Sequence, residues 1–549
     1  MKLFWHLRPG FKDTPVNLVK LDLSKLFELQ VLVVESEQEL LHLIKQMLLG
    51  LGIRKINCAR SLEELFENNE KLPYDIILLD YAIDDSMNGA EIVEEMISAG
   101  ILPNRTRLIL MAAQNDRAQY AIEYPYHQVE YLARPFNKQH LDLQLKQHVM
   151  YGQFLKPILA LAGLRRFSDA LKILLHTQQQ KLPPGLAQHL QKLKVQLLLD
   201  LGKFELVLPL LKTALAEQQG WALWALFRIR YERGDLAGCE AFLQDGSEEL
   251  AKYAERREVW QLYLALQQQD YAKACQISAK IPNVGMSMKM VRLVHLVMVL
   301  AGKIDAALEF IERKRRLAVQ GKLFIQLSVA QARSLLYLLT SADAKQQTQL
   351  NAQLQQLQHS IEADPASRYF QAELLLLKVH QYHLSGQCQA ANSLLIAQQQ
   401  LLEPAGKTVS LLCHAAVVFA SLGLMHTAFD YLFYANQCFD QMSDNSSRVF
   451  AGCLHRQTFD FIIASEQRAT CYAEMAKRHQ QLQEWRLAAK MYHAAWRLSS
   501  ADAATAEHYL QQLYPLMQQL AVPQFRGVPL PAPFVQQASA QSAVNNTSS

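Results

Sequence analysis

Short apolar runs alternate with helix-like segments between residues 29 and 150. Five short runs are strand candidates, and Val31–Val34 is wholly apolar, as expected of a strand buried on both faces. They cover Val31–Val34, Arg54–Ala59, Asp75–Asp80, Arg107–Met111 and Gln128–Leu132. Between them, apolar residues recur every three or four positions, which indicates amphipathic helices. Such alternation predicts an open, parallel, doubly wound α/β sheet, with its ligand chemistry at the carboxyl ends of the strands.

The helices of this domain have readable boundaries. Gly50 and Gly52 end the first helix, and Ser61 with Glu64 three positions later is typical of a capping box at the start of the second. Two further helices are expected over Asn88–Ala99 and Asn137–Val149, and the last of these closes the domain.

Behind Tyr151 the pattern changes to successive amphipathic helices. One element recurs there: a small or polar residue, an apolar one two positions later, and usually an alanine three positions after that. The apolar positions of the first five copies lie 37, 32, 35 and 33 residues apart, at Phe167, Phe204, Leu236, Tyr271 and Ile304. A period near 34 is typical of tetratricopeptide-like helical repeats. We interpret the small residues as points where helices approach closely.

The middle of this region is less regular, because the period is lost between Ile304 and Cys388. Breaks between helices are predicted at Pro183, Pro282, Pro365, Pro404 and Pro515. The expected organisation is an N-terminal extension at 1–28 with one short helix near 16–29, the α/β domain at 29–150, the repeats at 151–521 and a tail at 522–549. The tail is rich in Pro, Gln, Ser and Ala, so we expect it to be disordered.

Composition and charge argue against several kinds of function. A net charge of +4 on 549 residues is too small to indicate nucleic-acid binding. The basic run Arg313–Arg316 is better explained as a solvated helical face. The most apolar stretch, Val291–Ala301, contains Arg292 and His295 and is too short to cross a bilayer. With no signal peptide and no C-x-x-C pair among the eight cysteines, we expect a cytoplasmic protein without a membrane partner.

Five motifs stand in order in the α/β domain. They are Val31–Glu37 (VLVVESE), Asp80 at the end of DIILLD, Met87-Asn88-Gly89, Leu108–Ala113 (LILMAA) and Tyr131–Phe136 (YLARPF). Over about 120 residues this set resembles the receiver domain of bacterial response regulators, in particular receivers followed by tetratricopeptide-like repeats. The resemblance implies a flavodoxin-like α/β fold with a five-stranded parallel sheet, followed by an all-α solenoid.

The resemblance also implies a role for each strand-end residue. Asp80 corresponds to the phosphoacceptor, which receives its phosphoryl group from a sensor histidine kinase or a phosphotransfer protein. The other positions are the acidic pocket at Glu35, Ser36 and Glu37, the lysine position at Arg134, and the switch positions at Ala112 and Tyr131. In the family, acidic side chains beside the phosphoacceptor hold Mg²⁺, which here assigns Glu35 and Asp80 as metal ligands.

Three of these positions depart from the family's pattern. Ser36 replaces an acid and is a poor Mg²⁺ ligand, which puts metal binding in doubt. Arg134 keeps the charge of a lysine but not its point-like geometry. Ala112 has no hydroxyl group to bond a phosphoryl oxygen. The sequence therefore leaves open whether Asp80 is phosphorylated.

Two interpretations of the whole chain follow. The first is a two-component response regulator that acts as a protein-interaction adaptor, with its repeats presenting a concave surface to an unidentified protein partner. The alternative is a non-phosphorylated pseudo-receiver scaffold that binds its partner constitutively. No nucleotide-binding, serine-hydrolase or zinc-protease motif occurs, so we do not expect an enzyme.

Overall fold

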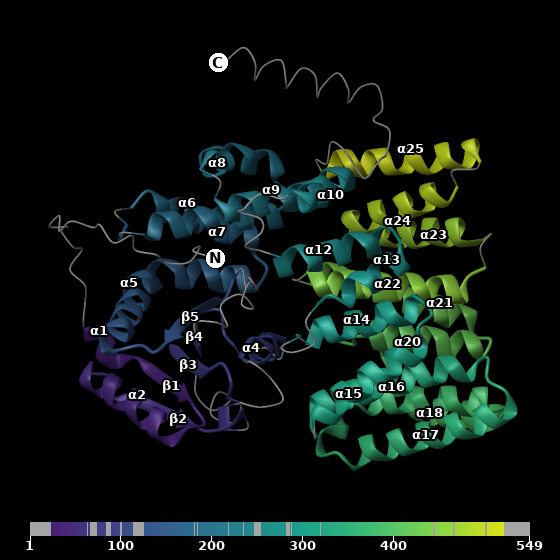
Figure 1. Cartoon of the computed structure of the whole chain (residues 1–549). Coiled ribbons are helices and arrows are strands. Elements are labelled where there is room, and N and C mark those ends of the chain that lie inside the picture. Colours follow the sequence, from purple (N-terminus) through teal and green to yellow (C-terminus); the bar gives the residue numbers. More distant parts are fainter. Residues whose placement is uncertain are drawn as a thin grey trace. The chain divides into compact units, whose positions relative to one another are not determined.

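The computed structural model describes residues 24–520 with short gaps, shown as a ribbon in Figure 1. The gaps are 63, 66–73, 84–88, 99–101, 114–125, 181, 184, 218, 234, 246–253, 282–285, 287, 319, 443–444, 465–466 and 500–501. The chain divides into two compact units. Unit 1 comprises Met1–Glu232, Leu236–Glu258 and Ile281–Ser287, and unit 2 comprises Arg233–Asp235, Val259–Lys280 and Met288–Ser549.

Unit 1 contains a five-stranded sheet in which every strand pair is parallel. Its strands are β1 Gln30–Val34, β2 Lys55–Ala59, β3 Ile76–Asp80, β4 Arg107–Ala113 and β5 Gln128–Arg134. Their order across the sheet is β2-β1-β3-β4-β5. After β2 the chain crosses over β1 and places β3 on its other side, and β4 and β5 are then added outward from β3. The predicted parallel α/β fold is confirmed, and β4 and β5 each continue two residues beyond the predicted ends.

Successive residues of each strand belong to opposite cores of the sheet, because side chains alternate between its two faces. Val31 and Val33 pack in one core with α1 Ser24–Glu28, α2 Gln38–Gly50 and the start of α5 Lys138–Gly163. Leu32 and Val34 pack in the other with α4 Gly89–Ser98. Both faces are covered, which is why the inner strands β1, β3 and β4 appear in the sequence as largely continuous apolar runs.

Helix α5 begins as predicted but runs far beyond Val149. Asn137 caps it through a capping box with His140, and the helix then continues without a break to Gly163. Leu141 and Leu145 pack under the sheet, whereas later residues pack in a separate core with the next two helices. One helix therefore serves both the α/β domain and the first repeat, and residue 150 lies in its interior.

The remaining described chain is helical. Its elements are α6 Phe167–Gln178, α7 Leu186–Asp200, α8 Phe204–Ala216, α9 Gly220–Arg233, α10 Leu236–Gln244, α12 Ala254–Gln267, α13 Tyr271–Ser278, α14 Met288–Leu300, α15 Ile304–Leu317, α16 Lys322–Leu339, α17 Ala344–Ala363, η2 Pro365–Tyr369, α18 Gln371–Leu384, α19 Cys388–Gln398, η3 Gln399–Leu402, α20 Val409–Ser421, α21 Met425–Gln437, η4 Cys438–Gln441, α22 Asn445–Ile462, α23 Arg468–Gln481, α24 Trp485–Leu498 and α25 Ala503–Gln519. Consecutive helices pack as hairpins, which confirms the tetratricopeptide-like solenoid.

The recurring sequence element is the turn inside each hairpin. Seven residues that stand two positions before the apolar residue have a positive φ, and they are Arg165, Gly202, Gln269, Gly302, Gly386, Gly423 and Gln483. A Cβ added at Gly202, Gly302, Gly386 or Gly423 would meet nothing within 4 Å. Our interpretation of these residues as points of close helix approach was therefore wrong: they supply the left-handed backbone of the turn. Close packing belongs to the alanines further along, such as Ala307 and Ala428, which are fully buried.

The proline predictions have mixed outcomes. Pro183, Pro365 and Pro404 lie between α-helices, as predicted, whereas Pro515 lies inside α25, where the prediction was wrong. The buried side chains on both sides of it, Leu513 and Leu516, hold that helix in place despite the lost backbone hydrogen bond. Pro282 lies outside the described residues.

The long middle helices explain the loss of the period after Ile304. Helices α16 and α17 contain 18 and 20 residues, and the 3-10 turn η2 follows them. Of the expected N-terminal helix, only Ser24–Glu28 is described, and the predicted tail at 522–549 lies outside the described residues.

Candidate functional site

Polar side chains meet where four parallel strands end. Glu35 directly follows β1, Asp80 is the last residue of β3, Ala112 lies near the end of β4, and Arg134 is the last residue of β5. Parallel strands bring their carboxyl ends to one edge of a sheet, so these four sequence-predicted positions share one crevice.

Arg134 connects the two carboxylates of the crevice. One of its terminal nitrogens donates to Oε2 of Glu35, and the other lies 3.2 Å from Oδ1 of Asp80. Glu35 is 1% exposed and Asp80 7% exposed, whereas the Arg134 side chain is 26% exposed. The guanidinium group therefore covers two buried acids and compensates one of their two negative charges.

The environment of Asp80 disfavours its charged form. Burial raises the pKa of this carboxyl above its usual value, and the neighbouring charge of Glu35 adds to that effect. Arg134 and the backbone N–H groups of Tyr81 and Ala82 act in the opposite direction. Removing Arg134 would therefore leave two buried acids with little to hold their charge.

The other acidic positions of the predicted pocket do not join the site. The side chains of Ser36 and Glu37 are exposed, and neither makes an ion pair or side-chain hydrogen bond among the described residues. The backbone N–H of Glu37 donates to Oε1 of Glu35 at 3.2 Å, so the loop turns Glu35 inward and leaves Glu37 outside.

This set of side chains does not fit Mg²⁺. The ion needs several oxygen ligands in octahedral geometry, but Glu35 and Asp80 are already bonded to Arg134, and Ser36 contributes no charge. In the part of the chain that the structure describes, no group of three His, Cys, Asp or Glu side chains could hold a metal ion. Asp84 and Asp85, which the sequence places nearby, lie outside the described residues.

An aromatic side chain packs beside Ala112, the position that lacks the family's hydroxyl group. Tyr131 packs against Ala112 and Tyr81, and its burial raises the pKa of the phenol. Gly89 opens α4 against the same corner, where a Cβ would lie 3.0 Å from Cα of Tyr81 and 2.9 Å from Leu110. That close approach explains why the predicted Met87-Asn88-Gly89 turn needs its glycine, although Met87 and Asn88 are not described.

Comparison with known proteins agrees with this geometry. The family described as "Response regulator receiver domain" matches residues 31–146. The N-terminal domain is a response regulator receiver domain. No curated protein matches the chain. Among solved structures, the crystal structure of the P58(IPK) TPR domain matches with 14% identity, covering 67% of this chain and 98% of that one. Its TM-score of 0.17 is too low to carry an argument about the repeats.

The receiver domain is joined to the first repeats by more than α5. The hydroxyl of Tyr126 donates to Asp200 of α7, and Arg228 of α9 pairs with the same carboxylate at 2.5 Å. The Tyr126 ring also stacks on Phe167 of α6, with 5.5 Å between centroids. Sequence reasoning missed this network, because its members lie up to 102 positions apart and belong to no motif.

Within the receiver domain, a second buried polar network has a structural role. Arg107 is 2% exposed and donates to the backbone carbonyl of Gln144 at 2.9 Å and to Glu130 of β5. It thus fastens α5 to the last two strands. It was not predicted either, since Arg107 opens an otherwise apolar run.

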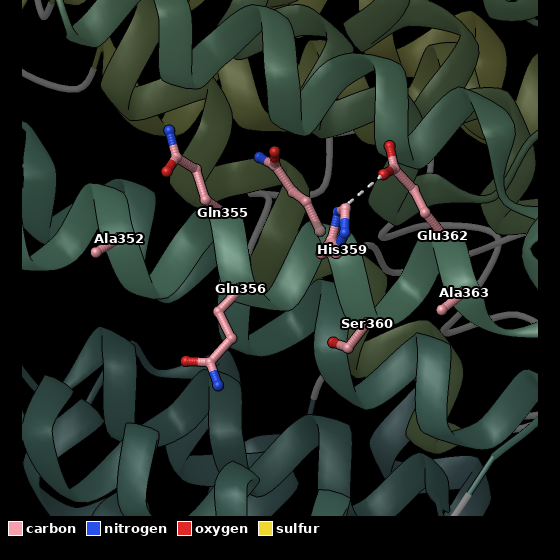
Figure 2. A pocket seen from close by; sticks show the side chains of 8 residues that line it. Ala352, Gln355, Gln356, His359, Ser360, Glu362 and Ala363 are labelled. Atoms are coloured by element: carbon pink, nitrogen blue, oxygen red, sulfur yellow. Dashed lines mark ion pairs between the residues drawn. The ribbon is translucent and has the colours of Figure 1, made fainter.

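A hollow with polar side chains in its lining lies on the surface of the repeats and is shown in Figure 2. All its lining residues belong to the single helix α17, and they include Gln355, His359 and Glu362. His359 and Glu362 lie 3.8 Å apart as neighbours on the surface of that helix. A catalytic centre requires groups that converge from several elements, so this hollow is not a candidate active site. Among the described helices, none is both long and apolar enough to cross a membrane.

Proposed function

We propose that this chain is a signalling adaptor whose receiver domain is a fixed docking platform and whose repeats bind a protein partner. The observation that carries the proposal is the Arg134 guanidinium bonded to both Glu35 and Asp80. In that arrangement the arginine supplies the positive charge that a metal ion supplies in the family. One of the site's two carboxylate charges is then compensated without any ligand.

Three further features support a receiver that does not switch. Ala112 has no hydroxyl to follow a phosphoryl group, and Tyr131 already packs against it. Ser36, at the second acidic position, points away into solvent. A switch needs two states that a ligand distinguishes, and here the groups that would sense the phosphoryl group are absent or already occupied.

The helical region supports the binding half of the proposal. Stacked helical hairpins present long surfaces to which extended segments of other proteins bind. The receiver shares α5 and the Tyr126–Asp200 contact with the first repeats, so it is positioned as part of unit 1. The expected partners are a two-component protein at the receiver and an unidentified protein at the repeats.

Phosphorylation of Asp80 is the second candidate function. It is favoured by the position of Asp80 at the end of β3, where hydrogen bonding to the backbone of Ala82 and Tyr81 lowers the pKa of its carboxyl and so favours the charged form. In this case Arg134 takes the place of the family's lysine, and a histidine kinase or phosphotransfer protein is the donor.

Mass spectrometry separates the two functions. The full-length protein is incubated with acetyl phosphate and Mg²⁺, and its intact mass is measured. We expect no phosphoryl adduct on the wild type and one adduct on the S36D/A112T/R134K variant, which restores the family's residues. The same variant with D80A added is the control and should stay unmodified. An adduct on the wild type that D80A removes would instead establish the second function.

Partner capture tests the adaptor role. Tagged wild type and D80A are used to isolate partners from the native cytoplasm, with and without acetyl phosphate. The fixed platform predicts the same partners in equal amounts in all four samples. Partners that appear only with wild type and phosphodonor would contradict it.

A further inference from the structure

Among the described residues, neither of two arginines on helices of unit 2 forms an ion pair with a carboxylate. Nη2 of Arg292 on α14 donates to Oγ of Ser410 on α20 at 2.9 Å, and its guanidinium lies 4.7 Å from the centre of the Phe450 ring on α22. Nε of Arg333 on α16 donates to Nδ1 of His414 on α20 at 3.4 Å. Four helices thus bring two cations to one place.

The neighbouring groups leave this charge uncompensated. Nε2 of His414 lies 3.2 Å from Nδ1 of His380, and burial lowers the pKa of both rings, that of His380 to about 4. Both rings are therefore neutral at pH 7. Glu373 influences Arg333 from a distance but makes no ion pair with it, and neither arginine has an ion pair among the described residues.

Desolvation of these arginines is costly. Burial lowers the pKa of Arg333 to about 10 and also lowers the pKa of Arg292. Both residues are nevertheless partly exposed rather than fully buried. A buried cation without a counter-ion destabilises a fold, and a bound anion would remove that cost.

We propose that Arg292 and Arg333 form a binding site for an acidic segment of a partner protein, with one carboxylate side chain for each arginine. The proposal adds a ligand class to the proposed partner-binding role of the repeats. It does not involve Asp80 or Arg134, so it can fail independently of the receiver's function.

The spacing of the two arginines favours an extended peptide over a single phosphoryl group. Their contacts on α20, Ser410 and His414, are four residues apart, which is about 6 Å along a helix. Alternate side chains of an extended chain lie on the same side, about 6.6 Å apart. A Glu-x-Glu segment therefore matches two arginines held one helical turn apart, each by its own partner.

Calorimetry on the full chain tests the site. The probe is acetyl-Gly-Glu-Gly-Glu-Gly-amide, and the peptide with Gln in place of both Glu residues is the control ligand. We expect R292Q/R333Q to bind the probe at least about tenfold more weakly than wild type, because each lost contact is a hydrogen bond between charged groups. R313Q/R497Q removes two exposed arginines on α15 and α24 and is the matched control, with a change below about twofold at moderate salt.

The R292K/R333K variant keeps both positive charges and is the control for misfolding. Circular dichroism measures the helical content of each variant. Binding by this variant and loss in R292Q/R333Q support the site. Equal binding of the Glu and Gln peptides, or equal binding by wild type and R292Q/R333Q, would overturn it. In a parallel titration, inorganic phosphate that binds wild type while the peptide does not would also overturn it and assign the arginines to a phosphoryl ligand.

Discussion

Replacing Arg134 with alanine tests how strongly the receiver site depends on its internal cation. The substitution removes one hydrogen bond to Glu35 and one ion pair to Asp80, and it leaves two nearly buried carboxylates together. Breaking a buried pair in this way costs about 3–5 kcal/mol. Since the Arg134 side chain is 26% exposed, we expect the lower end, about 3 kcal/mol, or roughly 6–12 °C in the melting temperature of unit 1.

The pH dependence gives this prediction its specific signature. Burial raises the pKa of Asp80 in the folded protein above its usual value, so its protonated form is the better tolerated one. The stability that this group contributes is present below its unfolded pKa and is lost as the pH rises through its higher folded pKa. Removing Arg134 raises that folded pKa further, so the deficit of R134A should shrink as the pH falls from 7 towards 4.

Thermal unfolding followed by circular dichroism at several pH values is the assay. R105A is the matched control, because Arg105 lies in the same domain with an exposed side chain, and it should unfold like wild type at every pH. If R134A is as stable as R105A at pH 7, the guanidinium does not hold the two acids. If its deficit is the same at pH 5 and pH 7, the electrostatic explanation is wrong.

Three further predictions concern the repeats and their junction with the receiver. G302A should lower the free energy of unfolding by about 1 kcal/mol, because Gly302 has a positive φ and no neighbouring atom would clash with the added methyl group. G452A, at a helical glycine where the added methyl group also meets no atom, should raise the free energy of unfolding by about 0.8 kcal/mol. A change of the same sign in both variants would contradict the turn role of Gly302. R333M should leave the free energy of unfolding of the ligand-free chain unchanged or raise it by about 1 kcal/mol, because it removes a cation that has no ion pair among the described residues. A clear decrease in that free energy, measured by urea denaturation, would mean that the fold needs the charge. Y126F should destabilise unit 1 by about 2 kcal/mol through the lost bond to Asp200, and Y337F, at an exposed tyrosine, is its control; equal melting temperatures would show that the contact does not hold the receiver to α7.

Much of the fold was predictable because it depends on local periodicity. The five short runs marked the strands, and the inner strands β1, β3 and β4 are buried on both faces. The spacing of Phe167, Phe204 and the later apolar positions marked the hairpins. The same sequence gave no sign that α5 continues past Val149, because a helix that changes from one core to another keeps an uninterrupted helical pattern.

The residues of the candidate sites were likewise predictable only in part. The order of motifs placed Glu35, Asp80, Ala112 and Arg134 at strand ends, and parallel topology then brought them together. Which acids face inward could not be predicted, since the turn after β1 directs Glu35 to the crevice and Glu37 to solvent. For the arginine pair there was one clue, Arg292 within the most apolar stretch of the chain.

The sequence by itself determined the strands, the repeat period and the residues available at each strand end, because these follow from neighbours along the chain. Only the tertiary structure decided that Arg134 reaches two carboxylates, or that Arg292 and Arg333 each bond to a side chain of α20 with no carboxylate partner in the part of the chain that is described. These contacts join residues 54 to 118 positions apart. Their energies depend on burial and distance, which exist only once the helices and strands have packed.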